Sequence, residues 1–193
     1  MRRDYKVTLR TEESIAYEAL RWRTVAGVDL DDAVDIVAFV QRLCRTELPG
    51  KGRPTLNLFE GEQGATPAFV TYRPLTLAVE RETWDFARLG DPDSLYILAH
   101  EIGHIVLHDL HPKAFAVGPV DTSLYGLDDW SAEWQANTFA DYFLLPDHIL
   151  RRRVSVEDAM VACGVSRQLA ARRWRRSVAK MRRRQSEVEG TGR

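Results

Sequence analysis

Cysteine is scarce in this chain of 193 residues, which has only Cys44 and Cys163. They lie far apart in sequence and outside any Cys-x-x-Cys pair, which excludes a disulfide framework and gives no support for a thiolate metal site. No run of residues is long and apolar enough to cross a membrane. The basic N-terminus leads into polar residues rather than an apolar signal region. Together these absences predict a cytoplasmic protein without membrane association.

Each part of the chain is poor in charge of one sign, although the formal net charge is only −1. Residues 1–150 carry 14 Lys and Arg against 24 Asp and Glu, a net charge of −10, whereas residues 151–193 carry 13 against 4, a net charge of +9. An acidic body would attract a basic surface, such as the DNA-binding face of a repressor. Alternatively, the two parts dock on one another and neutralise their charges. Both interpretations remain open.

The segment His100-Glu101-Ile102-Gly103-His104 lies in an apolar run that begins at Leu95. On a helix, residues four apart lie one turn above each other, so the two imidazoles can bind one metal ion. Zinc in catalytic sites takes three protein ligands and a water, and the intervening glutamate can act as general base. The motif therefore indicates a zinc hydrolase, against the alternative of a helix that happens to carry two histidines.

Gly103 is the unusual residue of this motif. Glycine inside a helix costs about 1 kcal/mol relative to alanine. Its presence predicts that another part of the molecule approaches the helix backbone at this point.

The third ligand must come from outside the motif. The long form of the motif, which continues with glycine and histidine, is excluded because Leu107 and Leu110 stand at those positions. His108 lies about 80° around the helix from His100, at 100° per residue, so we expect it to cap the helix or pack nearby. The downstream candidates are His108, His111, Glu133, Asp141 and His148.

Glu133 begins a helical segment that Pro146 ends. Residues 133, 137 and 141 form one polar stripe on it, which is either a solvated edge or a metal ligand at Glu133 with supporting acceptors at Asn137 and Asp141. Apolar residues in the same segment indicate that it is packed, and a buried carboxylate needs a partner. This favours the metal-site interpretation.

These two motifs, the second being Glu133-x-x-Ala136-Asn137-x-Phe139-Ala140 followed by Leu144-Leu145-Pro146, resemble the ImmA/IrrE metallopeptidases, or M78 peptidase family. Members often have a second glutamate where this chain has Gln135. The resemblance implies one zinc ion held by His100, His104 and Glu133, with Glu101 as general base.

By the same resemblance, the substrate would be a helix-turn-helix repressor or antitoxin, whose cleavage releases mobile-element, stress-response or toxin-antitoxin genes. The alternative is a non-catalytic regulator that binds DNA or a repressor and whose zinc site is structural or vestigial. The presence of Glu101 beside the three ligand candidates favours the enzyme, because a structural zinc site has no need of Glu101.

The predicted fold is α+β, a zincin-like domain over residues 1–150 with a small, mostly antiparallel sheet packed on helices. Apolar spacing predicts a helix over residues 12–26, ended by Gly27, and a second helix from near Asp31. Residues 55–59, 68–72 and 75–80 are typical of short strands. An extended peptide could pair with the sheet edge beside the metal. Residues 113–129 are expected to form a loop at the site.

The C-terminal part, residues 151–185, is predicted to be a basic, helix-turn-helix-like region. Helices over residues 156–163 and 167–178 flank the turn Gly164-Val165-Ser166. It is a candidate for nucleic-acid binding, repressor docking or a structural role. Residues 186–193 are expected to be a disordered tail.

An oxyanion formed during hydrolysis needs a donor besides zinc. Tyr72, Tyr125, Tyr142 and His148 are candidates, and the sequence alone does not choose among them.

Overall fold

The computed structural model describes residues 5–28, 33–61, 66–108 and 128–190, with side chains described as far as Arg182. The elements in chain order are α1 (Glu12–Ala26), α2 (Ile36–Leu43), β1 (Thr55–Phe59), β2 (Ala68–Tyr72), β3 (Leu75–Glu80), α3 (Arg81–Arg88), α4 (Pro92–Leu107), a short 3-10 helix η2 (Asp128–Trp130), α5 (Ala132–Leu144), α6 (Asp147–Leu150), α7 (Val156–Cys163) and α8 (Arg167–Gly190). The predicted α+β class is confirmed. Most of the predicted loop over residues 113–129 lies outside the described residues.

The sheet has three strands in the order β1-β3-β2, and their bounds are those that the sequence predicts. β2 and β3 pair antiparallel across a tight turn, with Tyr72 opposite Leu75, whereas β1 and β3 pair parallel, with Thr55 opposite Thr76. The sheet is therefore mixed rather than mostly antiparallel. The tight turn places β2 on one edge of β3, antiparallel to it. β1 pairs with the other edge of β3 and runs parallel to it.

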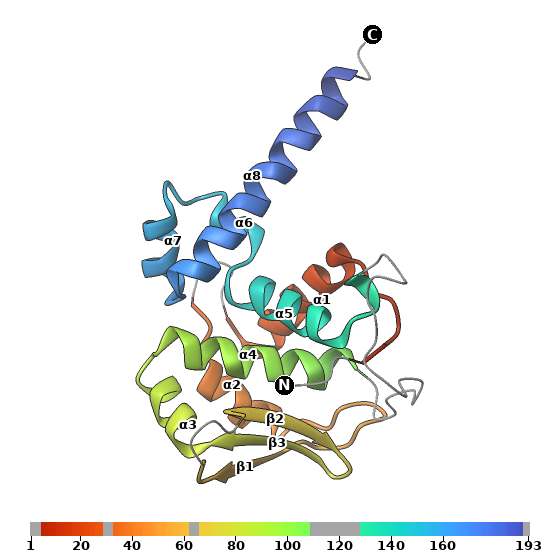
Figure 1. Cartoon of the computed structure of the whole chain (residues 1–193), viewed down its shortest axis with the longest axis vertical. Helices are drawn as coiled ribbons and strands as arrows, with labels where there is room; N and C mark the ends of the chain where they lie inside the picture. The colour runs from red at the N-terminus through yellow and green to blue at the C-terminus, as the bar shows by residue number, and fades with distance from the viewer. Residues whose placement is uncertain (1–4, 29–32, 62–65, 109–127, 191–193) are drawn as a thin grey trace.

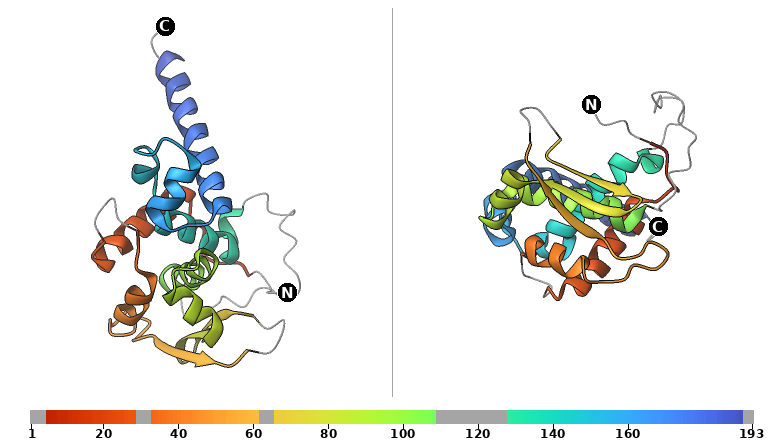
Figure 2. Two further views of the ribbon diagram at one scale, coloured as in Figure 1. Left: turned by 90° about the vertical axis from the view of Figure 1, so that its left-hand side faces the viewer. Right: turned by 90° about the horizontal axis from the view of Figure 1, so that it is seen from below.

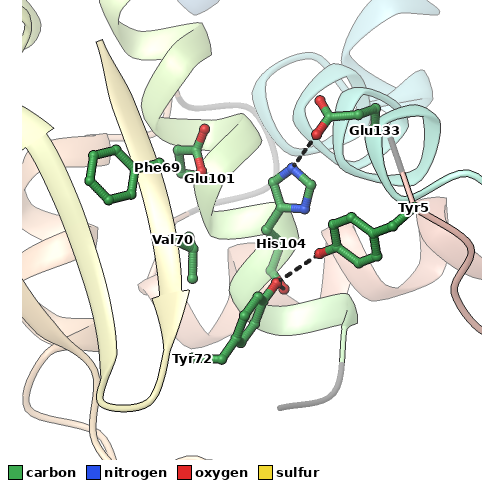
Figure 3. Close-up of a pocket in the computed structure, with 7 residues that line it drawn as sticks. All are labelled: Tyr5, Phe69, Val70, Tyr72, Glu101, His104 and Glu133. Atoms are coloured by element: carbon green, nitrogen blue, oxygen red, sulfur yellow. Dashed lines mark hydrogen bonds and ion pairs between the residues drawn. The ribbon is translucent and has the colours of Figure 1, made fainter. Parts of the chain in front are cut away.

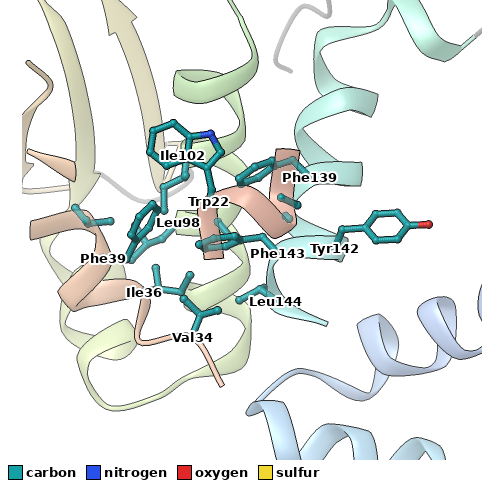
Figure 4. Packing of buried hydrophobic residues seen from close by; sticks show 14 of the residues in the cluster. Trp22, Val34, Ile36, Phe39, Leu98, Ile102, Phe139, Tyr142, Phe143 and Leu144 are labelled. Atoms are coloured by element: carbon teal, nitrogen blue, oxygen red, sulfur yellow. The ribbon is translucent and has the colours of Figure 1, made fainter. Parts of the chain in front are cut away.

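Helix α4 lies between the sheet on one side and α5 on the other (Figure 1). Its apolar residues face both layers, and α1 and α2 complete the packing around α5 and α4 (Figure 2). The core is aromatic at its centre, where Phe143 lies 5.2 Å from both Phe39 and Phe139, measured between ring centroids (Figure 4). This packing fixes α5, and with it the polar stripe, against α4.

Local signals set most helix ends. Gly27 ends α1 in the left-handed conformation with φ of 70°, and Asp91 caps α4 by accepting a 2.8 Å hydrogen bond from the Ser94 amide. The second helix begins at Ile36 rather than near Asp31, because Asp35 is its cap and accepts from the Ala38 amide. Helix α3, which the sequence analysis did not predict, follows β3 without a loop.

The C-terminal helices α7 and α8 meet at Gly164, as predicted, and α8 then projects beyond the body (Figure 1). Its helical backbone continues to Gly190, so residues 186–190, expected in a disordered tail, are part of the helix. Glutamate, glutamine and arginine are good helix formers, which explains the extension. No helix within the described residues is long and apolar enough to span a membrane.

Basic side chains of α8 turn toward the acidic body. Arg173, fully buried, donates to the Leu145 carbonyl at 3.0 Å and pairs with Asp147 at 2.5 Å. Lys180 pairs with Glu12 of α1 at 3.1 Å. These contacts support the interpretation in which opposite charges in the two parts of the chain hold them together.

Candidate metal centre

The two histidines of α4 project from one face of the helix toward α5. Their Nε2 atoms lie 3.0 Å apart, and both rings are buried, with His100 8% and His104 5% exposed. One helical turn therefore brings together two nitrogens that could bind one metal ion, as the spacing predicts.

Glu133 comes to this point from the first turn of α5. Its carboxylate oxygens lie 3.3 Å from His100 Nε2 and 3.4 Å from His104 Nε2. Hydrogen bonds from the two histidines hold the pKa of Glu133 well below its ordinary value, so it is a carboxylate. Of the four third-ligand candidates among the described residues, Glu133 is the one that forms a group with both histidines, with all three ligand atoms within 4.8 Å of one another. His111 lies outside the described residues.

This donor set fits zinc. Two imidazole nitrogens and one carboxylate are the ligands of many catalytic zinc sites, and they leave one coordination position open. A cavity of about 210 Å³ lies beside this group and is lined by His104, Glu133 and Glu101, with Tyr5, Phe69, Val70 and Tyr72 around them (Figure 3).

Helix α5 can approach this closely because residue 103 is glycine. A Cβ atom at Gly103 would lie 3.1 Å from the Cα and the carbonyl oxygen of Ala136. The close approach that the sequence predicted at Gly103 is thus the contact between the two helices that carry the site.

The second ring nitrogen of each histidine also has a partner. His100 Nδ1 lies 3.0 Å from Asn137 Oδ1, one turn after Glu133, in agreement with the expected role of Asn137. His104 Nδ1 lies 3.1 Å from His108 Nδ1. Burial, together with the neighbouring His104, lowers the pKa of His108 to about 3, so this ring is neutral. His108 therefore packs beside the site, as expected.

Asp141, the last residue of the polar stripe, was expected to hold a histidine ring. Instead its buried carboxylate accepts from Arg172 at 2.5 and 2.9 Å, with Arg176 at 3.6 Å and the Tyr96 hydroxyl at 3.4 Å. The sequence could not show this, because Arg172 lies 31 residues away on α8.

Tyr72 is the oxyanion-donor candidate that lines the cavity. Burial and the neighbouring Tyr5 raise the pKa of Tyr72 above its ordinary value, so the hydroxyl keeps its proton. It donates to the His104 carbonyl at 3.3 Å. Tyr142 and His148 line a different cavity, beside α1 and α6, and Tyr125 lies outside the described residues.

Tyr5 lines the same cavity, although the sequence analysis did not select it. Its hydroxyl lies 3.2 Å from that of Tyr72, and its ring stacks on His104 at 6.4 Å between centroids. The segment after it pairs with residues 129–132, and Gln135 fixes the segment by donating to the Thr8 carbonyl at 2.8 Å. No local sequence pattern predicts such a pairing between segments more than 120 residues apart.

Comparison with known families agrees with this geometry. Residues 87–175, which contain both motifs, match the Peptidase_M78 family model, described as an IrrE N-terminal-like domain. This part of the chain is therefore similar to the M78 peptidase family. The matched residues include α4, α5 and the start of α8, while Tyr5 and the sheet lie before them.

Two individual proteins are also similar to this chain. Uncharacterized immunity region protein 2 of Bacillus phage phi105 is 31% identical over 88 residues, which cover 44% of this chain and 52% of that protein. A Mycobacterium tuberculosis transcriptional regulator has a similar fold, with a TM-score of 0.53 at 15% identity, over 82% of this chain and 45% of that one. The chain thus spans about half the length of each relative.

Proposed function

We propose that this protein is a zinc-dependent endopeptidase. The observation that carries the proposal is the convergence of His100, His104 and Glu133 beside a cavity that the Glu101 carboxylate also lines. A bound zinc ion would supply positive charge that polarises a peptide carbonyl and acidifies a water molecule.

Glu101 is the general base in this proposal. Its side chain is 1% exposed and lines the cavity next to His104, so it can take a proton from the attacking water and pass it to the leaving amine. Tyr72 and Tyr5 line the same cavity, and a hydroxyl donor there can stabilise a developing oxyanion. A site with a structural zinc ion would have no use for this buried acid.

Strand β2 offers a way to hold a peptide. It is an edge strand of the sheet, and its Phe69 and Val70 line the cavity beside Glu101. An extended substrate can add to such an edge by backbone hydrogen bonds, which demand little of its sequence. Similarity to the M78 family supports a helix-turn-helix repressor or antitoxin as the substrate, and the phage relative, whose name refers to an immunity region, agrees with this.

The docking of α8 bears on the alternative, a DNA-binding regulator. Arg172 and Arg173 form ion pairs with Asp141 and Asp147 of the body, and Arg176 lies 3.6 Å from Asp141, so these arginines hold α8 against the body. The observations favour the peptidase.

The test combines metal analysis with cleavage of repressors encoded in the same genome. Wild type should contain about one zinc per chain, Glu133→Ala should lose it, and Glu101→Gln should keep zinc and fold but not cleave. Zinc retained in Glu133→Ala would contradict the ligand set. Cleavage by Glu101→Gln would contradict the role of Glu101, and a DNA complex with steep salt dependence and no cleavage would favour the regulator.

A further inference from the structure

A chain of polar contacts runs from the C-terminal helix α8 to His100, the first histidine of the candidate metal site. Arg172 holds both carboxylate oxygens of Asp141 at 2.9 and 2.5 Å and also reaches the Tyr96 hydroxyl at 3.4 Å. The Tyr96 hydroxyl donates to Asn137 Oδ1 at 3.1 Å, and that oxygen also faces His100 Nδ1 at 3.0 Å. Three helices, α4, α5 and α8, contribute to it.

The direction of the Tyr96 hydrogen bond depends on Arg172. Tyr96 has one proton and two acceptors within reach, Asn137 at 3.1 Å and Asp141 at 3.4 Å. A free carboxylate would be the stronger acceptor, because charged partners make the stronger hydrogen bonds. Arg172 occupies both Asp141 oxygens and donates to the Tyr96 oxygen, so the tyrosine proton is left for Asn137.

The orientation of the Asn137 amide in turn decides which ring nitrogen of His100 carries the proton. With its oxygen held by Tyr96, Asn137 presents an acceptor to His100 Nδ1, which therefore carries the ring proton. With the proton kept on Nδ1, Nε2, the nitrogen that faces Glu133 and His104, can supply its lone pair when a metal ion binds. If the amide turned round, its NH₂ group would favour a lone pair on Nδ1 and a proton on Nε2, and Nε2 could not bind a metal.

We propose that Arg172 is a positioning residue for His100. It acts through Tyr96 and Asn137, and it makes the metal affinity of the catalytic helices depend on the docking of α8. This inference rests on the proposed function for its biological meaning, but the state of the His100 ring can be measured without metal.

Two variants test the network. Tyr96→Phe removes one hydroxyl and leaves the ion pair between Arg172 and Asp141 in place, so the fold is retained. Arg172→Met removes the guanidinium but also weakens the docking of α8. Arg175→Met, at an exposed position of the same helix, is the matched control. Thermal unfolding of each metal-free variant reports the purely structural effect.

The first readout is zinc affinity, measured by competition with a chelator. We expect Tyr96→Phe and Arg172→Met each to weaken zinc binding by about ten- to a hundredfold, as loss of an outer partner of a ligand does elsewhere. In the Tyr96→Phe background, Arg172→Met should add little, because both changes break the same chain. Arg175→Met should bind as wild type.

The second readout is ¹⁵N NMR of the histidine rings in metal-free protein, with His100 assigned by substitution. Nδ1 should carry a proton in the wild type, and Tyr96→Phe should show a mixture of protonated and unprotonated Nδ1. Unchanged zinc affinity and an unchanged ring in both variants, with only the unfolding temperature lowered, would overturn the proposal and leave the peptidase standing. If wild type binds no zinc, the proposed function fails, and the NMR result alone decides whether the network holds His100.

Discussion

Replacing Gly103 by alanine should damage the metal site more than the fold. The added Cβ would lie 3.1 Å from the Cα of Ala136 and 3.3 Å from the Cβ of Phe139. Carbon atoms pack comfortably at about 3.5 to 4.0 Å, so α5 must move away by roughly 0.4 Å or more. Glu133 and Asn137 lie on the same helix and move with it.

The magnitudes follow from this displacement. Overpacking of a core costs about 1 to 3 kcal/mol, and alanine in place of glycine within a helix offsets about 1 kcal/mol of that. The net loss of folding stability is therefore about 0 to 2 kcal/mol. Metal sites tolerate errors of only about 0.2 Å in ligand distance, so we expect zinc affinity to fall by at least about tenfold, which is about 1.4 kcal/mol.

The assay pairs chelator competition for zinc with urea unfolding of the metal-free protein. Gly164→Ala is the matched control, because φ there is +61° and nothing lies within 4 Å of the new Cβ. Backbone strain should cost it about 1 to 2 kcal/mol with zinc affinity unchanged. If Gly103→Ala bound zinc as tightly as wild type, the argument that this glycine sets the distance between the two helices would be refuted.

Two further predictions concern His108 and Glu12. His108→Ala should weaken zinc binding through loss of the contact with His104, but less than His104→Ala in the same chelator titration; equal losses would show that the ligand set is wrong. Burial raises the pKa of Glu12, but hydrogen bonds with Tyr142 and Lys180 outweigh it and hold this pKa below its ordinary value. The stabilising effect of Glu12 is therefore present above about pH 4.3 and is lost as the pH falls through the lowered value. The difference in unfolding temperature between wild type and Glu12→Gln should close on acidification, and a constant difference would contradict the assignment.

The elements that the sequence predicted well are those with local signals. Periodic apolar residues and Gly27 gave α1 its observed bounds, and alternation with turn residues gave all three strands. The sequence did not reveal the parallel pairing of β1 with β3 or the start of α2, because strand pairing depends on distant partners and the cap at Asp35 was not recognised.

In the candidate site, too, local features were predicted from the sequence and contacts between distant segments were not. The spacing of His100 and His104 is a property of one helix, so it was readable. Glu133 could be selected as a ligand candidate from its segment, but its place between the two rings depends on how α5 packs on α4. Tyr5 and the pairing of Asp141 with Arg172 were not predicted, since each joins segments far apart in the chain.

The sequence by itself determined the metal-binding face of α4, the glycine at its centre and the charge contrast between the two parts of the chain, because these are features of composition and helical period. Only the tertiary structure decided which carboxylate lies beside the two histidines, which tyrosines line the cavity and which arginine is connected to His100 through Tyr96 and Asn137. Those contacts arise when separate helices pack, and the free energy of packing depends on the shapes of all partners at once.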